Sequence, residues 1–338
     1  MLLAIPMSNP AEEVLPPLES RPWGPWSASE IVTRAVSIYR EKFALFFSVS
    51  LAAALLLYAM EIPALLFFFS LVQRVVGHPA QMSPRIFLPI LPLGMLWWAG
   101  GIFIQCAVMG TIFRAVEKLK AGETLAIPEA IREGLEISRR TFATGLLVML
   151  RIAGWYLAIA AGFIVVIASF FGLAHVFGIK MSGGYAGGAV LGFFAVVFML
   201  CFFFAYLILI AWLVSRYFVT IPCALNSQDG LNKSISNAVR MTKGRRARIY
   251  AVMAVAFIAM IMATVAATPV NLVMMAVLAQ HADHWWTLMG PYQLAMQFVV
   301  GIAQAFLFYP FLGIGMSLCY FDLMARINPP EQRIAEAL

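Results

Sequence analysis

The chain has 338 residues, of which 62% are hydrophobic and only 12% carry a charged side chain. Soluble domains contain about 45–50% apolar and about 25% charged residues, so this composition excludes an ordinary soluble enzyme. A membrane-spanning helix takes about 20 apolar residues, and the chain has room for several with short connections. The composition therefore predicts an all-α, polytopic membrane protein.

The N-terminal 26 residues hold six prolines and are predicted to form a disordered cytoplasmic tail. A membrane domain is expected over residues 27–328, followed by a short cytoplasmic tail at 329–338. Each apolar segment within the domain is long enough to cross a hydrocarbon core of about 30 Å. The sequence predicts six transmembrane helices, within residues 43–72, 86–113, 143–179, 185–214, 249–280 and 288–323.

The positions of the basic residues predict the orientation of these spans. Nineteen Lys and Arg residues lie in the stretches that six spans place on one side of the membrane, and three lie on the other side. Cytoplasmic loops of membrane proteins carry an excess of Lys and Arg. We therefore expect a multi-pass protein of the bacterial cytoplasmic (inner) membrane, with both termini in the cytoplasm.

Three stretches that precede a span have apolar residues at helical spacing. The second follows the first at an offset of 99 residues, and the third follows the second at an offset of 104. We predict three pseudo-repeats, at about residues 27–120, 121–226 and 227–328, each with two spans preceded by a cytoplasmic interfacial amphipathic helix. These helices are expected at Ser29–Phe43, Pro128–Phe142 and Gly230–Arg246. Ser27 and Glu30 have the spacing of a capping box for the first.

The segment RYFVTIP followed by GLNKSISNAVRMTKGRRARI resembles a signature of bacterial six-span proteins. These are grouped as the membrane domain of glycerophosphoryl diester phosphodiesterase and its relatives of unknown function. The segments PWSASEIVTRAVSIYREKF and CYFDLMAR, the latter containing Asp322, resemble the opening and closing segments of that family, so the resemblance covers about residues 27–328. In the third amphipathic segment, Val239 stands at the position where members of that family usually have a tryptophan. The matching positions of the signature are Arg216, Tyr217, Pro222, Gly230, Thr242, Lys243, Gly244 and Arg245.

In that family, the phosphodiesterase activity belongs to a separate soluble barrel that only some members carry. We expect no such barrel in this chain, which lacks the His-Arg and Glu-x-Asp segments that the metal-dependent reaction needs. The resemblance therefore implies a membrane domain without this enzymatic activity, and the sequence predicts no catalytic residues.

Basic residues near the predicted membrane surface are candidate contacts for lipid head groups. Each juxtamembrane cation attracts anionic lipid by about 1 kcal/mol, although the same charges also enforce topology. No nucleic-acid-binding motif accompanies them, so nucleic acid is excluded as a partner. The candidate residues are Arg139, Arg140, Arg240, Lys243, Arg245, Arg246 and Arg248.

Arg151 lies about eight residues into the third span, which is unusual for a charged side chain. Gly154, Ala158 and Gly162 follow on the same helix face, and small residues mark helix-packing faces. We therefore expect Arg151 to point into the bundle. The alternative is a side chain that extends toward the cytoplasmic interface.

Other polar residues also lie within the predicted spans. Glu61 is expected near the outer interface, about 18 residues into the first span. Gln297 and Gln304 share a face of the sixth span, where they can form interhelical hydrogen bonds or line a polar path. The loop from His281 to His284 has too few ligands for a closed metal site, so we expect neither a metal nor a cofactor.

These features predict a non-enzymatic scaffold or accessory protein that engages anionic lipids, a second copy or another membrane protein through basic interfacial helices. A transporter or channel with a polar path near Arg151, Gln297 and Gln304 is the alternative. A lipid-modifying enzyme is a third interpretation, which has less support because the loops are short and recognisable catalytic residues are absent.

Overall fold

The computed structural model describes residues 23–77, 90–176, 204–227, 230–280 and 285–327. These residues contain no strand. Six of their helical segments are long and apolar enough to cross a membrane. They are Phe43–Ala64, Gly94–Lys120, Ile127–Ile159, Phe204–Asn226, Arg246–Val277 and Ala295–Ile327. The structure thus confirms an all-α, multi-pass membrane protein with six candidate spans. Most of the predicted fourth span, residues 185–203, and most of both predicted tails lie outside the described residues.

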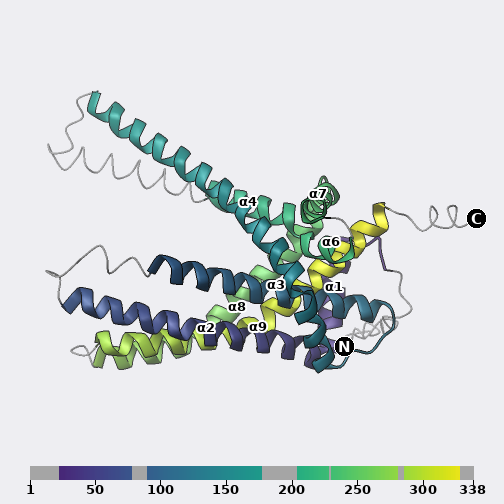
Figure 1. Ribbon diagram of the computed structural model, residues 1–338, viewed down its shortest axis with the longest axis horizontal. Helices are drawn as coiled ribbons and strands as arrows, with labels where there is room; N and C mark the ends of the chain where they lie inside the picture. Colours follow the sequence, from purple (N-terminus) through teal and green to yellow (C-terminus); the bar gives the residue numbers. More distant parts are fainter. Residues whose placement is uncertain (1–22, 78–89, 177–203, 228–229, 281–284, 328–338) are drawn as a thin grey trace, which may run out of the picture.

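Long helices dominate the structure, because apolar spans must satisfy their backbone hydrogen bonds internally. Figure 1 shows α2, α3, α8 and α9 running side by side, whereas α4 diverges from them along its second half. Residues 204–217 are also helical and lead into the short helix α6. The helices are α1 (Ala28–Glu41), α2 (Phe43–Gly77), α3 (Ile90–Lys120), α4 (Ile127–Val176), α6 (Thr220–Asn226), α7 (Leu231–Thr242), α8 (Arg246–Gln280) and α9 (Trp285–Ile327).

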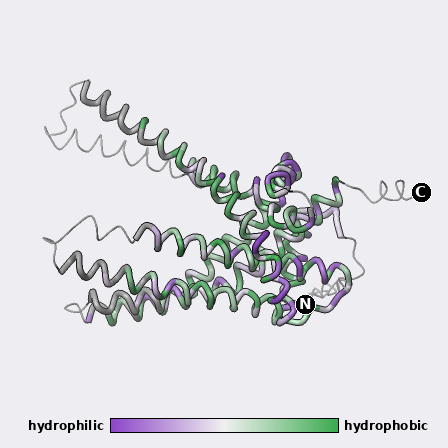
Figure 2. Tube along the Cα trace, viewed as in Figure 1, coloured by the Kyte–Doolittle hydropathy of each residue, from purple (hydrophilic) through white to green (hydrophobic). Residues whose placement is uncertain are grey.

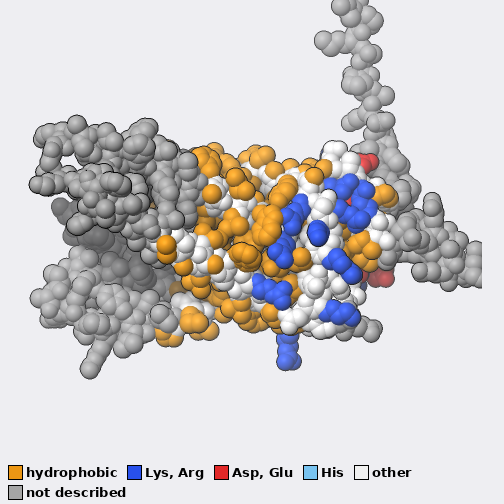
Figure 3. Space-filling model, turned by 90° about the horizontal axis from the view of Figure 1, so that it is seen from above, with side chains coloured by type: hydrophobic (Ala, Val, Ile, Leu, Met, Phe, Trp, Pro, Cys, Tyr) orange, Lys and Arg blue, Asp and Glu red, His pale blue; other side chains and the backbone are white. Residues whose placement is uncertain are grey.

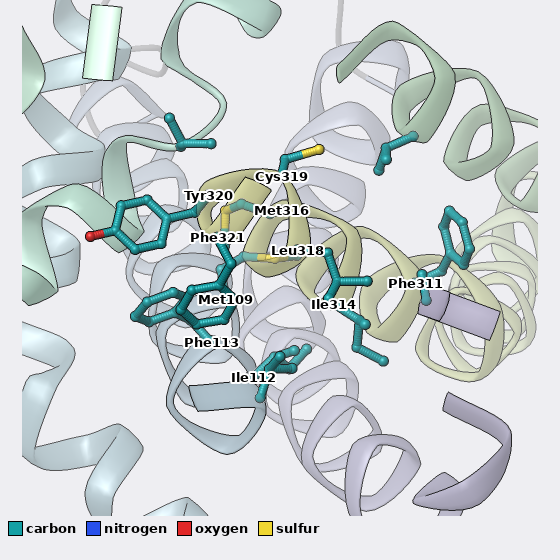
Figure 4. Packing of buried hydrophobic residues seen from close by; sticks show 14 of the residues in the cluster. Met109, Ile112, Phe113, Phe311, Ile314, Met316, Leu318, Cys319, Tyr320 and Phe321 are labelled. Carbon is teal, nitrogen blue, oxygen red and sulfur yellow. The ribbon is translucent and has the colours of Figure 1, made fainter. Parts of the chain in front are cut away.

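One end of the molecule holds the shorter helices and most of its hydrophilic residues (Figure 2). Lys and Arg side chains gather over this part of the surface (Figure 3). We call it the basic end, and define it as α1, α6 and α7 together with residues 109–145, 212–219, 243–252 and 309–327. Its interior is a hydrophobic core. Figure 4 shows part of this core, where Phe113 of α3 stacks on Phe321 of α9 with ring centroids 5.8 Å apart.

Helix α1 begins with the capping box that the sequence predicts. The Ser27 hydroxyl accepts a hydrogen bond from the Glu30 amide (3.2 Å), and the Ser27 amide donates to the Glu30 carboxylate (2.6 Å). This backbone hydrogen bond lowers the pKa of the Glu30 carboxyl, because it stabilises the charged form. The buried face of α1 packs on α8 and α9, which places the helix across the end of the bundle.

Tyr39 fastens the other end of α1 to α9. Pro310 lies inside α9 and has no amide hydrogen, so the carbonyl oxygen of Phe306, four residues earlier, lacks its helical donor. The Tyr39 hydroxyl donates a hydrogen bond to this oxygen. Burial raises the pKa of Tyr39 to about 12, so its hydroxyl remains a donor at neutral pH. A side chain from α1 therefore satisfies a backbone group that proline leaves open.

Helices α3 and α4 approach each other most closely through small residues near the basic end. A Cβ added at Gly134 would lie 1.8 Å from Thr111 Oγ1, and one at Gly145 would lie 2.1 Å from Cys106 Sγ. The predicted packing face at Gly154 and Gly162 makes no such contact, since a Cβ there would meet no described atom within 4 Å. The reason is that α4 diverges from α3 beyond this region (Figure 1).

A fully buried carboxylate, Asp322 of α9, joins distant parts of the chain at the basic end. It accepts a hydrogen bond from the Trp26 amide (2.6 Å), and its oxygen atoms lie 3.0 Å from Arg326 Nε and 3.5 Å from Arg248 Nε. Both arginines also donate to the Trp26 carbonyl oxygen, at 2.7 Å and 2.9 Å. Each charged group is thus paired and hydrogen-bonded, which is what burial of a charge requires.

We predict that Asp322→Asn lowers the free energy of unfolding. Removing one partner of a buried ion pair costs about 3–5 kcal/mol, and we expect the lower end because the two arginine side chains are about a quarter exposed. Denaturant titration of the purified protein in mixed micelles measures the loss. Glu123→Gln removes an exposed carboxylate and is the control. Equal stability of the two variants would contradict the proposed role of Asp322.

Candidate functional site

Two guanidinium groups share one indole ring where the fourth and fifth candidate spans meet the basic end. Arg216 lies one helical turn after Trp212, and its Cζ is 5.3 Å from the centroid of that ring. Arg246 begins α8, and its Cζ is 5.2 Å from the same centroid. Such cation–π contacts contribute about 0.5–2 kcal/mol each. We call these three residues the arginine–tryptophan cluster.

The connection between α7 and α8 places Arg246 beside Arg216. The Thr242 hydroxyl, at the end of α7, donates a hydrogen bond to the Arg216 carbonyl oxygen (3.2 Å). Gly244 then adopts φ of +76°, a left-handed conformation that favours glycine, and turns the chain into α8. Thr242 and Gly244 of the family-like signature therefore shape the cluster without themselves carrying charge.

The positive charges of the cluster have no counter-ion among the described residues. No described carboxylate lies within 4.0 Å of Arg216 or Arg246. The Nε atoms of both are buried and have no hydrogen-bond partner there. Arg248, only two residues after Arg246, binds Asp322 instead. Guanidinium groups match the geometry of phosphate and carboxylate oxygens, so this arrangement is suited to an anion.

The seven basic residues that the sequence offers as lipid contacts differ in their surroundings. Arg140 donates a hydrogen bond to the Ser227 carbonyl oxygen, and Arg248 binds Asp322, so the fold itself uses both side chains. The remaining residues are exposed or half-buried at the basic end, where an external partner can reach them. They are Arg139, Arg240, Lys243, Arg245 and Arg246.

Arg151 is exposed rather than directed into the bundle. Its Nη2 donates a hydrogen bond to Asn232 Oδ1 of α7 (3.0 Å). The apolar neighbour Ile152 instead packs against a small core formed by Leu213, Tyr217 and Ile235. The structure thus fits the alternative in which the Arg151 side chain extends toward the interface and not into the bundle. The face of α4 that carries Arg151 is turned away from α3.

The other intramembrane polar residues meet in a cavity of about 560 Å³ between α2, α3 and α9. Glu61, Gln297 and Gln304 all line it, whereas Arg151 does not. Glu61 therefore faces the space between these helices, which is partly open to the outside of the bundle because lining residues such as Leu55 and Trp98 are exposed. A polar path that includes Gln297 and Gln304 does not extend to Arg151 in the described structure.

Three residues were missed by sequence reasoning, namely Arg216, Gln105 and Trp212. Arg216 matched the family-like signature but was not among the candidate lipid contacts. Gln105 also lines the cavity, and its position in an apolar segment, like that of Gln297, is a signal that could have identified it. Trp212 gave no signal, because tryptophan is common at membrane interfaces. No group of His, Cys, Asp or Glu in the described residues could hold a metal ion, and residues 281–284 lie outside them.

Comparisons with protein-family models, curated proteins and solved structures found no match to this chain.

We predict that Arg151→Gln changes the free energy of unfolding by less than about 1 kcal/mol, because an exposed hydrogen bond contributes little. The micelle unfolding assay measures this value, with Asp322→Asn as the reference for loss of a buried charge. A loss of more than about 2 kcal/mol would mean that Arg151 supports the bundle interior after all.

Proposed function

We propose that this chain is a non-enzymatic scaffold or accessory protein of the bacterial inner membrane, whose basic end binds the phosphate groups of anionic lipids. The arginine–tryptophan cluster carries the proposal. Its two half-buried guanidinium groups lie against one ring, and no described carboxylate neutralises them. A lipid phosphate supplies both the missing negative charge and several hydrogen-bond acceptors.

The location of the cluster favours a lipid over a soluble anion. Trp212 and Arg216 belong to the candidate span Phe204–Asn226, and Arg246 is the first residue of the span Arg246–Val277. Arg246 thus lies at a span end, and the apolar segment predicted for the fourth span, residues 185–214, ends two residues before Arg216. We therefore place the cluster near the layer that lipid head groups occupy. Tryptophan is enriched in this layer, and basic residues there attract anionic lipid by about 1 kcal/mol each.

The distribution of basic residues supports a cytoplasmic position for the basic end. Nineteen Lys and Arg residues lie in stretches assigned to this side and three in those of the other side. The rule that positive loops stay inside then places both termini in the cytoplasm. Anionic lipid of the cytoplasmic leaflet would face the cluster in this orientation.

The buried positions of the interfacial segments support a threefold repeat. At the offsets of 99 and 104 residues, Ile31 of α1 corresponds to Ala130 of α4 and Ser234 of α7, and all three are almost fully buried. The next position on the same face is small and buried in each segment. It is occupied by Ala35, Gly134 and Ala238. A common pattern of burial is what three helices with a shared docking mode would have.

We predict that a leucine at the small position destabilises all three segments. Overpacking a tight contact costs about 1–3 kcal/mol, and a side chain at Gly134 would meet Thr111 directly. The unfolding free energy in micelles is again the measurement. The variants are Ala35→Leu, Gly134→Leu and Ala238→Leu.

Matched controls lie two residues before each small position, where the side chains are exposed. Leucine there is expected to change the unfolding free energy by no more than about 0.5 kcal/mol. If any of the small positions tolerates leucine as well as its control, the three segments do not share one docking mode. The controls are Thr33→Leu, Arg132→Leu and Ser236→Leu.

The lipid proposal predicts a selective effect of phosphatidylglycerol. Added to the full-length protein in neutral detergent, this lipid should raise the unfolding temperature more than phosphatidylcholine does, because a ligand stabilises the state that binds it. The double variant Arg216→Gln, Arg246→Gln should weaken the apparent affinity for phosphatidylglycerol about tenfold to thirtyfold, as expected for the loss of two surface cations.

The double variant Arg40→Gln, Lys42→Gln is the control, since it removes the same net charge from exposed positions on the same end. It should retain most of the selectivity. An equal loss in both double variants would mean that overall charge, and not the arginine–tryptophan cluster, attracts the lipid. No selectivity in the unmodified protein would overturn the proposal.

A transporter is the second candidate function, and the intramembrane cavity is the observation that favours it. The cavity gathers Glu61, Gln297 and Gln304 among helices that cross the membrane. Intramembrane acids and amides of this kind mark substrate or ion pathways in many transporters. This candidate retains the two glutamines of the predicted polar path but not Arg151.

A further inference from the structure

The cavity between α2, α3 and α9 has the size of a site for a small organic molecule. Its volume of about 560 Å³ falls within the range of about 300–1,000 Å³ that is usual for such sites. It borders the basic end at Tyr309 and extends away from it, because Glu61 is near the far end of the span Phe43–Ala64 and Gln297 is near the start of Ala295–Ile327. It is therefore separate from the arginine–tryptophan cluster along the bundle.

The polar groups of the cavity are rich in oxygen acceptors. A carboxyl group comes from Glu61, a hydroxyl group comes from Tyr309, and amide groups, each with an acceptor oxygen and a donor NH2, come from Gln105, Gln297 and Gln304. The Oε1 atom of Gln297 is buried and has no hydrogen-bond partner among the described residues. No Lys, Arg or His is found among the described lining residues, so no cationic side chain there offsets a negative charge on Glu61.

Glu61 also lacks an ion-pair partner elsewhere in the described structure, where no Lys or Arg nitrogen lies within 4.0 Å of its carboxylate. An unpaired carboxyl group within a membrane is stable as the neutral acid, or as a carboxylate once a partner offsets its charge, because that charge is costly in the hydrocarbon layer. A bound cation would supply that partner. A cation that pairs with ionised Glu61 is therefore favoured in this cavity over an anion.

Aromatic residues indicate that the cation is organic rather than a bare metal ion. Trp97, Trp98, Tyr58 and Phe298 line the cavity, and the rings of Tyr58 and Phe298 lie 5.0 Å apart. Aromatic faces attract organic cations through their ring quadrupole, and they accommodate apolar substituents at the same time. The remaining lining side chains are mostly aliphatic or methionine, which suits a ligand with apolar groups around its charge.

We propose that this cavity binds a lipophilic organic monocation, with a central ammonium or phosphonium charge and apolar substituents, and that Glu61 is its counter-ion. The aromatic residues contact the substituents, and the three glutamines complete the polar part of the site. This inference is independent of lipid binding at the basic end.

Tetraphenylphosphonium is a direct probe, because tetraphenylborate has the same shape and the opposite charge. Equilibrium binding of each ion to the full-length protein in neutral detergent should show saturable binding of the phosphonium and none of the borate. Glu61→Gln should weaken phosphonium binding about tenfold or more, since it removes the counter-ion. Glu61→Asp should retain most of the affinity.

Glu123→Gln is the matched control, because it removes an exposed carboxylate that does not line the cavity. The double variant Arg216→Gln, Arg246→Gln should also bind the phosphonium normally, so that failure of this proposal is distinguishable from failure of the lipid proposal. If Glu61→Gln does not fold, the comparison of phosphonium with borate binding to the unmodified protein still tests whether the cavity selects a cation. Equal binding of both ions, no binding of the phosphonium, or undiminished binding by folded Glu61→Gln would overturn the proposal.

Discussion

The basic end depends on the burial of a single carboxylate. Asp322 holds the Trp26 backbone and two arginines around itself, and so joins the segment before α1 to α8 and α9. Fixing Trp26 also places its ring 4.5 Å from the Arg34 guanidinium on the buried face of α1. Burying a charge is favourable only when its partners are complete. The four groups therefore form a unit that holds α1 across the end of the bundle.

This unit divides the basic residues of the molecule into two kinds. Arg248 and Arg326 are neutralised inside the fold, whereas Arg216 and Arg246 lie against Trp212 without a described carboxylate. The opposite imbalance occurs further along the bundle, where the cavity contains Glu61 without a described cation. Unbalanced positive charge at the interface suits anionic lipid, and unbalanced negative charge in the cavity suits a cation. In both places the described fold leaves a charged or ionisable group without a partner of opposite charge.

Local patterns in the sequence were sufficient to predict the spans and the Ser27–Glu30 capping box, because hydropathy and cap spacing act over a few residues. The contact between Trp26 and Asp322 could not be predicted in this way, since 296 residues separate the partners. Arg248 looked like a surface charge for the same reason. The sequence left Arg151 either inside the bundle or directed toward the interface. The choice depends on where α4 diverges from α3, which a single helix face does not reveal. The cavity could not be predicted either. Its lining residues come together only through the way α2, α3 and α9 are aligned along one another, and no single segment of the sequence contains that alignment.

Thiol labelling of Lys243→Cys, in a background without the native cysteines, tests the central claim that the basic end faces the cytoplasm. Lys243 is exposed in the turn between α7 and α8, beside the arginine–tryptophan cluster. A membrane-impermeant maleimide should label this residue in inverted membrane vesicles and leave it unmodified in intact spheroplasts. Labelling in spheroplasts, with protection in inverted vesicles, would place the basic end outside and contradict both the orientation and the proposed contact with lipid of the cytoplasmic leaflet.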